Sequence, residues 1–514
     1  MSNRNYNIYF HTHTVSGIVI SVVLYVIFFA GSFSFFRDEI INWERNEATA
    51  TSKEIQLDYK SALDTLDKKY ILKGRSIALS QPHAERRVNV FLEGTKDSLV
   101  DKKAREGQFF YLDTKTLQTS TYEDSYSLGE FLYRLHFLAQ VPYPIGYYLS
   151  GFVALFFLFA IVTGVLLHWK KIVSNFYIFR PKEKLKTLWT DAHTSLGLIG
   201  LPFQFVYAVT GAFFMIKIFI VAPSVVALYQ GDENKLYADL EYTDPVFEYG
   251  KIPLATPFDI DELVSRTKNT WKDFEITRVL IQNYGDKNMH VLVEGEMMYD
   301  KKFTGIGKII YKIDDGKIVA KKDPITENSY LDGVKNVLFR IHYGDYGGYL
   351  LKIISFILGL VTCFVIISGV MIWLTARDKK NMPEKKRKFN EGVVSIYLSI
   401  CLSMYPVTAL AFIVSKVFYP LSMTEIYSLY FISWLALTVF FILKKNNYFT
   451  NKYTLLSGSI LGFLVPISNG IVNGKWFWNS FAENQFQVFL IDVLWILLST
   501  ATLYTVFSLK KKTR

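Results

Sequence analysis

The sequence reads Leu132-Tyr133-Arg134-Leu135-His136 directly before one long apolar run and Leu338-Phe339-Arg340-Ile341-His342 directly before another. Two further apolar runs open with a second matched frame. His13 is followed by glycines 4 and 18 residues later, and His193 is followed by glycines at the same offsets. Ionisable residues at membrane boundaries are costly, so their duplication predicts a function. The spacing therefore predicts an internal repeat built around histidines.

The composition predicts a membrane protein with substantial soluble parts. Of 514 residues, 51% are hydrophobic and 20% are charged, which is too apolar for a soluble chain and too charged for spans alone. A spanning helix needs roughly 20 apolar residues. Eight runs meet this length, at residues 15–36, 147–167, 196–220, 350–374, 393–417, 426–443, 455–472 and 488–507.

Basic segments predict the orientation of these spans. Lysine and arginine concentrate in residues 170–186, in residues 376–392 and in the tail, residues 510–514. Positive residues stay in the cytoplasm, so both termini of this multi-pass protein are expected there. The net charge of +11 is thus read as a topology signal, and no nucleic-acid partner is expected. The two cysteines, Cys363 and Cys401, fall inside apolar runs, so neither a disulfide framework nor a cysteine-held cluster is expected.

This topology sends two segments of similar pattern, residues 37–145 and 222–346, to the outside. Each is expected to be a small α+β domain with one helix followed by four strands. The helices are predicted at residues 59–70 and 260–270. The strands are predicted at residues 75–80, 88–93, 109–112 and 117–122, and again at 276–281, 290–294, 309–313 and 317–321.

The expected fold class is an α-helical integral membrane protein with about eight transmembrane helices. Residues 1–190 and 191–375 form two parallel repeats whose spans make a four-helix redox bundle. The expected division is 1–36 for the first span, 37–145 for the first outer domain, 146–221 for two spans with a basic loop, 222–346 for the second outer domain, 347–375 for the fourth span, 376–392 for a basic loop and 393–514 for four further spans.

The histidines sort by depth in this topology, and the sorting suggests haem. His13, His168 and His193 lie at the cytoplasmic ends of spans, and His136 and His342 lie at the outer ends. Haem iron takes two axial ligands from opposite sides, as facing helices can supply. A pseudo-two-fold axis brings His136 opposite His342 and His13 opposite His193. Two haems are therefore expected, bound non-covalently because the chain has no Cys-x-x-Cys-His motif.

Several of these residues also have a simpler interpretation. A single histidine at a helix end is commonly a capping or interfacial residue. His168 has no histidine counterpart, because Trp373 occupies the equivalent position, yet it could replace a ligand of the cytoplasmic pair. His11 is about 200° around the helix from His13, so both cannot face the bundle axis. His83 and His290 are expected to be solvated side chains of the outer domains.

The glycines and arginines of the repeat, with one carboxylate, also leave alternatives open. The glycines make room for a macrocycle or for close helix packing; they are Gly17, Gly31, Gly164, Gly197, Gly211 and Gly369. Arg134 and Arg340 pair with haem propionates or extend to the interface. Asp492, one turn into the last run, is expected at the membrane interface and not in a proton path.

These elements resemble the PepSY-associated transmembrane family. The resemblance rests on Arg-Leu-His and Arg-Ile-His before the second and fourth spans, on Thr163-Gly164 and Ser368-Gly369, and on the His-x-x-x-Gly openings at His13 and His193. It covers about residues 5–380. The family includes iron-regulated inner-membrane proteins and ferric-siderophore reductases. The resemblance implies haem b held by bundle histidines, PepSY-like periplasmic domains and reduction of a ferric siderophore, and it implies no role for residues 393–514.

The expected function is electron transfer through the lipid bilayer from a cytoplasmic or quinol donor to a periplasmic acceptor, with a ferric siderophore as the expected acceptor. No acid–base catalytic residues are expected, because the cofactor performs the electron transfer. The alternative is a non-redox membrane sensor or transport accessory whose outer domains bind peptide, metal or an envelope partner.

Overall fold

The computed structural model describes every residue except 1, 48, 50, 51, 100–104, 181, 182, 241, 300, 380 and 510–514. Residues 182, 380 and 510–514 of the predicted basic segments thus lie outside the described residues. The chain divides into two compact units. The helical unit comprises Met1–Asn46, Ser127–Pro223 and His342–Arg514, and the sheet unit comprises Glu47–Tyr126 and Ser224–Ile341.

The helical unit contains the predicted membrane spans. Seven of its described helices are long and apolar enough to cross a membrane, and a bent helix pair makes up to eight, which confirms the predicted α-helical membrane class. Its first part comprises α1 (Asn3–Ser34), α2 (Arg37–Arg45), α4 (Leu128–Leu135), α5 (Ile145–His168), α6 (Ile172–Tyr177), α7 (Leu185–Ile199), α8 (Leu201–Ile216) and α13 (Gly348–Arg377). Within it, α1 packs against α5 and α13, and α7 packs against α13.

The predicted span at 196–220 differs from the structure, which has two helices there. The chain bends by 69° between α7 and α8. Pro202 lies in the first turn of α8 and has no amide hydrogen to donate to the carbonyl of Leu198. The chain bends at Gly200, the single residue between α7 and α8.

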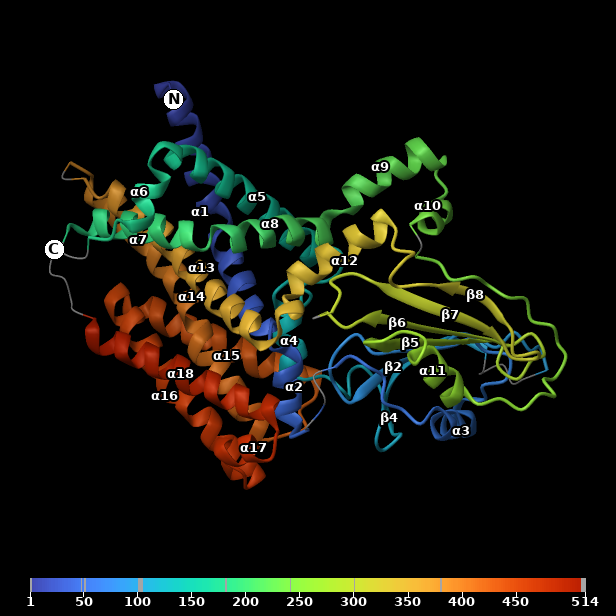
Figure 1. Cartoon of the computed structure of the whole chain (residues 1–514). Helices are drawn as coiled ribbons and strands as arrows, with labels where there is room; N and C mark the ends of the chain where they lie inside the picture. The colour runs from blue at the N-terminus through green and yellow to red at the C-terminus, as the bar shows by residue number, and fades with distance from the viewer. Residues whose placement is uncertain are drawn as a thin grey trace. The chain divides into compact units, whose positions relative to one another are not determined.

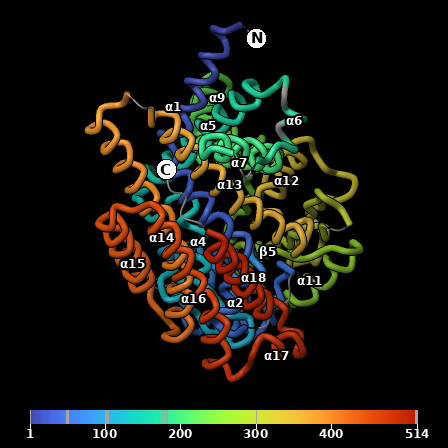
Figure 2. The backbone as a smooth tube through the Cα atoms, turned by 90° about the vertical axis from the view of Figure 1, so that its left-hand side faces the viewer, coloured from blue at the N-terminus to red at the C-terminus, as the bar shows by residue number. Residues whose placement is uncertain are grey.

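The C-terminal helices pack side by side in the same unit (Figure 2). They are α14 (Glu384–Val417), α15 (Met423–Lys444), α16 (Asn447–Asn473), α17 (Phe477–Ala482) and α18 (Phe486–Ser508). A reciprocal cap starts α15: the Ser422 hydroxyl accepts from the amide of Glu425, and the Glu425 carboxylate accepts from the amide of Ser422. We call α14–α18 the C-terminal block.

The sheet unit contains both predicted α+β repeats, and their strands form one sheet (Figure 1). The first repeat has α3 (Tyr59–Tyr70) and strands β1 (Ile77–Ser80), β2 (Arg87–Leu92), β3 (Gln108–Asp113) and β4 (Thr119–Ser120). The second has α11 (Ile260–Lys268) and strands β5 (Phe274–Gln282), β6 (His290–Met297), β7 (Ile306–Lys312) and β8 (Ile318–Lys322). The remaining helices are α9 (Ile218–Tyr229), α10 (Glu233–Asp239) and α12 (Tyr330–Tyr343), of which α9 and α12 connect the two units.

The two repeats join through their first strands. The strand order is β4-β3-β2-β1-β5-β6-β7-β8, and β1 pairs antiparallel with β5, with Ile77 opposite Ile281. This pairing uses two edges that would otherwise expose unpaired amides. Side chains from one face of both repeats, including the buried Leu79 and Val279, share one core with Tyr59 of α3 and Ile260 of α11. The predicted pair of small domains is thus a single sheet with pseudo-two-fold order.

Candidate functional site

The first histidine pair, His136 and His342, lies where the end of α4 meets the last turn of α12. His136 directly follows α4 and His342 lies in α12, with ring centroids 5.9 Å apart and planes at 31°. Both precede the candidate spans. Burial lowers the pKa of His136 to about 4, and burial together with His136 lowers the pKa of His342 to about 3. Both rings are therefore neutral near pH 7, the form in which imidazole binds a metal.

The second pair joins α1 to α7. The ring centroids of His13 and His193 are 6.1 Å apart, with planes at 74°. The structure thus brings together both pairs of histidines that the repeat predicts. His13 and Gly31 are 18 residues apart in α1, and Gly31 lies against the His136 ring. Because a helix rises about 1.5 Å per residue, the two histidine pairs are about 27 Å apart along α1.

Equivalent backbone carbonyls orient the rings of the second pair. Nδ1 of His13 lies 2.8 Å from the carbonyl oxygen of Ala160, and Nδ1 of His193 lies 2.9 Å from that of Val365. A carbonyl oxygen only accepts, so each Nδ1 carries the hydrogen and each Nε2 keeps its lone pair. The hydroxyl of Ser368 lies 3.0 Å from the same nitrogen of His193. This pattern is typical of metal-binding histidines, in which a hydrogen bond to one nitrogen fixes the tautomer that coordinates through the other.

Two glycines let these rings lie directly on the neighbouring helices. A Cβ atom at Gly164 would be 3.1 Å from Cε1 of His13, and one at Gly369 would be 3.3 Å from Cε1 of His193. Each glycine follows its carbonyl partner by four residues, on α5 and on α13 respectively. At these two positions the glycine serves close packing against a histidine.

Gly17 and Gly197, which follow His13 and His193 by one helical turn, have more open space beside them than Gly164 and Gly369. No described atom lies within 4 Å of a Cβ atom built at Gly17, and at Gly197 the nearest contact is Val365 at 3.9 Å. Gly31 and Gly211 show ordinary van der Waals contacts at 3.9 and 3.5 Å. The helix faces beside His13 and His193 therefore leave room next to the rings.

The pair His136–His342 is not symmetrical in its hydrogen bonds. The Thr210 hydroxyl donates to the carbonyl of Val206 at 2.7 Å, so its oxygen accepts from Nδ1 of His342, also at 2.7 Å. The equivalent position in the first repeat is Ala30, which has no hydroxyl. Nδ1 of His136 is buried and has no hydrogen-bond partner among the described residues.

His168 is the fifth predicted cofactor residue. It ends α5, one turn after Gly164, and is close enough to both His13 and His193 to interact with them electrostatically. Its counterpart Trp373 on α13 stacks under the guanidinium of Arg377 at 4.5 Å. Three histidines therefore gather at one end of the helical unit.

The remaining histidines lie away from both pairs. His11 is exposed and packs edge-on against Phe10. His83 is partly exposed. The prediction that His290 is solvated is wrong: it is only 4% exposed, because its ring stacks on Phe247 at 3.6 Å and its Nδ1 bonds the carbonyl oxygen of Asn288.

Both predicted propionate-binding arginines have carboxylate partners. Arg134 bonds Glu130 at 2.7 Å, and Arg340 bonds Glu296 at 2.7 Å. Burial opposes ionisation of Glu130, but Arg37 and Arg134 outweigh it and lower its pKa to about 2. These ion pairs are enough to explain where the two arginines lie, without a haem propionate as partner.

The spacing of the rings in each pair would suit two imidazoles that bind the same metal ion. Metal–nitrogen bonds of about 2.0 Å on both sides of an ion place two coordinating ring centroids roughly 6 Å apart. The observed separations are 6.1 and 5.9 Å. Aromatic rings of Tyr207 and Phe214 pack against His342, with ring centroids 5.2 and 5.0 Å from its own. The residues present therefore fit a haem at either pair.

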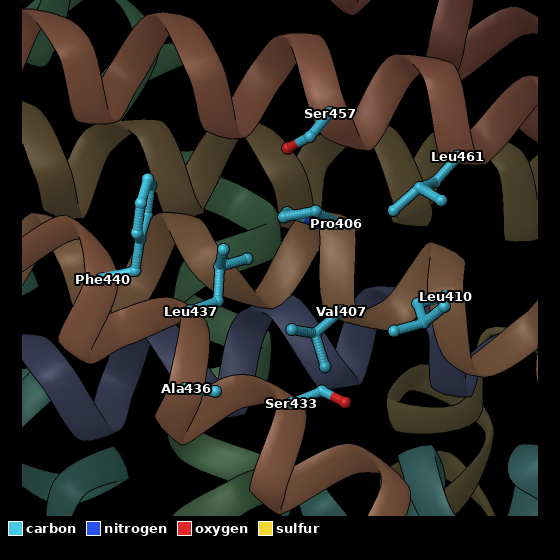
Figure 3. A pocket seen from close by; sticks show the side chains of 9 residues that line it. All are labelled: Pro406, Val407, Leu410, Ser433, Ala436, Leu437, Phe440, Ser457 and Leu461. Carbon is cyan, nitrogen blue, oxygen red and sulfur yellow. The ribbon is translucent and has the colours of Figure 1, made fainter.

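An apolar cavity of about 390 Å³ lies elsewhere, within the C-terminal block (Figure 3). Side chains of α14, α15 and α16 line it, with Pro406, Ser433 and Ser457 among them. Its lining contains no histidine and no charged residue. Without converging polar groups it does not compete with the histidine pairs as the functional site.

Sequence comparison assigns the family. The PepSY-associated TM region matches residues 10–376, which include both histidine pairs. The chain belongs to this family. The C-terminal block lies beyond the matched region. An uncharacterized protein of Pseudomonas aeruginosa is similar at 23% identity over 257 residues. The alignment covers 48% of this chain, which spans 64% of the length of that relative.

Sequence reasoning missed the partners that orient the rings. Backbone carbonyls leave no residue-type signal, so Ala160 and Val365 could not be found. The hydroxyl of Thr210 could have been found, because Thr210-Gly211 repeats the pattern of Thr163-Gly164 and Ser368-Gly369.

Proposed function

We propose that this PepSY-associated protein holds two b-type haems and carries electrons across a membrane. His13 and His193 would ligate one iron, and His136 and His342 the other. The proposal rests on the distances between the ring centroids, 6.1 and 5.9 Å, which suit two imidazoles on one metal ion. At three of the four rings Nδ1 carries the hydrogen, so Nε2 is free to bind the metal. Haem, when bound, supplies reversible one-electron chemistry.

The residues of the chain supply binding, orientation and exclusion of water. Carbonyl and hydroxyl acceptors fix the tautomers of His13, His193 and His342. A separation of about 27 Å along α1 places the pairs near opposite ends of a span. Basic loops facing the cytoplasm of a bacterial inner membrane, with both termini inside, would put His136–His342 and the sheet unit at the outer side.

The substrate we propose is a ferric siderophore reduced on the outer side, as the family resemblance implies. The donor would be a cytoplasmic reductant or a membrane quinol. Purified protein in liposomes tests this directly: chemical reduction from inside is expected to reduce an external ferric siderophore, and the His342→Ala variant is expected not to do so.

Cofactor content tests the proposal without an acceptor. Pyridine haemochrome analysis of protein made with adequate haem supply is expected to give two b haems per chain. His342→Ala and His136→Ala are each expected to leave one. Haem-free wild-type protein would overturn the proposal and favour a non-redox sensor or transport accessory. Retention of both haems in these two variants would return His136 and His342 to an interfacial role.

A further inference from the structure

A buried polar cluster connects the C-terminal block to α2. The Asp492 carboxylate of α18 accepts from Nε1 of Trp43 at 2.8 Å and from the amide of Asn469 at 2.8 Å. Lys416 of α14 donates to the carbonyl of Trp43 at 2.5 Å. Asp492, Lys416 and Trp43 are all 1% exposed or less. Burying charged groups is expensive, and removing one partner leaves the other uncompensated, so the cluster constrains where α2 can lie.

Helix α2 in turn holds α4. The Glu44 carboxylate accepts from the amide of Leu128, the first residue of α4, at 2.9 Å. Arg37 bonds Glu130 at 2.8 Å. Between these contacts, a Cβ atom at Gly129 would be 2.7 Å from the Arg37 carbonyl oxygen, so the two helices touch without an intervening side chain. The first turn of α4 is therefore held against α2 by two hydrogen bonds and a close backbone contact.

The C-terminal block also contacts α4 directly. Phe131 is fully buried, and its ring lies 4.8 Å from Tyr430, 5.6 Å from Tyr427 and 5.7 Å from Phe431, all on α15. Aromatic pairs at these centroid distances attract each other beyond the effect of the area that they bury. Helix α4 is thus held between α2 and α15.

His136 follows α4 directly and differs from the other three paired histidines. Hydrogen bonds at Nδ1 orient His13, His193 and His342, whereas Nδ1 of His136 has no partner among the described residues. The position of the His136 ring therefore depends on the packing of the backbone that carries it.

We infer that the C-terminal block positions His136 through α2 and α4. Asp492, Lys416 and Phe131 act as positioning residues for the site His136–His342 without touching its ligands. This inference rests on the proposed haem function, and it gives a role to helices that lie beyond the matched family region.

The test measures each haem separately in the full-length protein. Asp492→Asn replaces one of the two carboxylate oxygens that accept from Trp43 and Asn469 by an amide nitrogen, so one of these hydrogen bonds is lost. Phe131→Leu loosens the α15 contact. Ser459→Ala is the matched control, because it breaks a buried 2.7 Å hydrogen bond with Thr502 inside the C-terminal block, away from α2 and α4. The readouts are the midpoint potential and low-spin spectrum of each haem, assigned with His342→Ala and His193→Ala.

Asp492→Asn and Phe131→Leu are expected to shift the potential and spectrum of the His136–His342 haem, or to lose that haem alone, while the His13–His193 haem and the control stay at wild-type values. Unchanged haems, or equal shifts in both, would overturn the inference. If Asp492→Asn does not accumulate, Phe131→Leu decides. Wild-type protein without haem would instead overturn the proposed function itself.

Discussion

Three histidines lie at one end of the helical unit, but one iron accepts only two of them. The hydrogen bonds favour His13 and His193, because equivalent carbonyls of Ala160 and Val365 hold both rings in the coordinating tautomer. His168 shares the depth of the pair without a counterpart in the second repeat.

Substituting the three histidines one at a time is expected to show which two bind the iron and which one only lies near it. His13→Ala and His193→Ala each lose one haem, because a ligand is removed. His168→Ala keeps both haems with a shifted potential, because only the surroundings change. Haem content and redox titration check this. Haem loss in His168→Ala with retention in His13→Ala would assign His168 as the ligand.

The hydroxyl of Thr210 contacts one of the paired histidines. It accepts from Nδ1 of His342, which makes that ring a stronger electron donor to a metal. Thr210→Val keeps the shape and removes the acceptor, at a cost of about 1 kcal/mol in stability. The midpoint potential of the His136–His342 haem is expected to rise. An unchanged potential would show that the hydrogen bond does not tune the site.

At the scale of elements, helix faces beside the histidines differ in how much space they leave. Imidazole rings occupy the space beside Gly164 and Gly369, whereas the space beside Gly17, one turn along α1 from His13, is open. If a macrocycle occupies that space, a larger side chain will exclude it without disturbing the protein.

Gly17→Leu is therefore expected to lose the His13–His193 haem while the protein stays folded. Replacing a helical glycine by leucine removes a helix penalty of roughly 0.5–1 kcal/mol, so stability does not fall. Gly392→Leu is the control, because the space at Gly392 on α14 is equally open. Thermal unfolding and haem content are measured for both. Full haem occupancy in Gly17→Leu would place the macrocycle elsewhere.

The whole molecule is a duplicated chain whose copies are similar without being identical. Ring planes meet at 74° in His13–His193 and at 31° in His136–His342. In the sheet unit the copies meet through β1 and β5. In the helical unit α1 packs against α13 and α5 against α8, and each histidine pair takes one ring from each copy.

Two different low-spin signals are therefore expected from one oxidised protein by electron paramagnetic resonance. If each pair holds an iron, the angle between its two imidazole planes would affect the splitting of the iron d orbitals. The pair at 74° would then give the larger highest g value. His193→Ala is expected to remove that signal and His342→Ala the other. A single low-spin signal whose intensity corresponds to two irons per chain would contradict the prediction that the two sites differ in ring geometry.

Most helices and strands, and the pairing of the histidines, could be predicted from sequence patterns. Periodic apolar runs predict helices and strands because each buries a regular face, and α3, α11 and the strands of both repeats form close to the predicted positions. Duplicated frames predict which histidines meet, since equivalent positions in a repeat are related by one axis. The bend between α7 and α8 was missed because the local effect of Pro202 does not change hydropathy.

How the copies join and what surrounds the histidines could not be predicted from sequence patterns. Pairing of β1 with β5, burial of His290 and the cluster around Asp492 depend on contacts between residues far apart in the chain. Such contacts have no periodicity, and backbone carbonyls such as those of Ala160 and Val365 are the same in every residue type. Their positions follow from how the helices pack, which local sequence pattern does not encode.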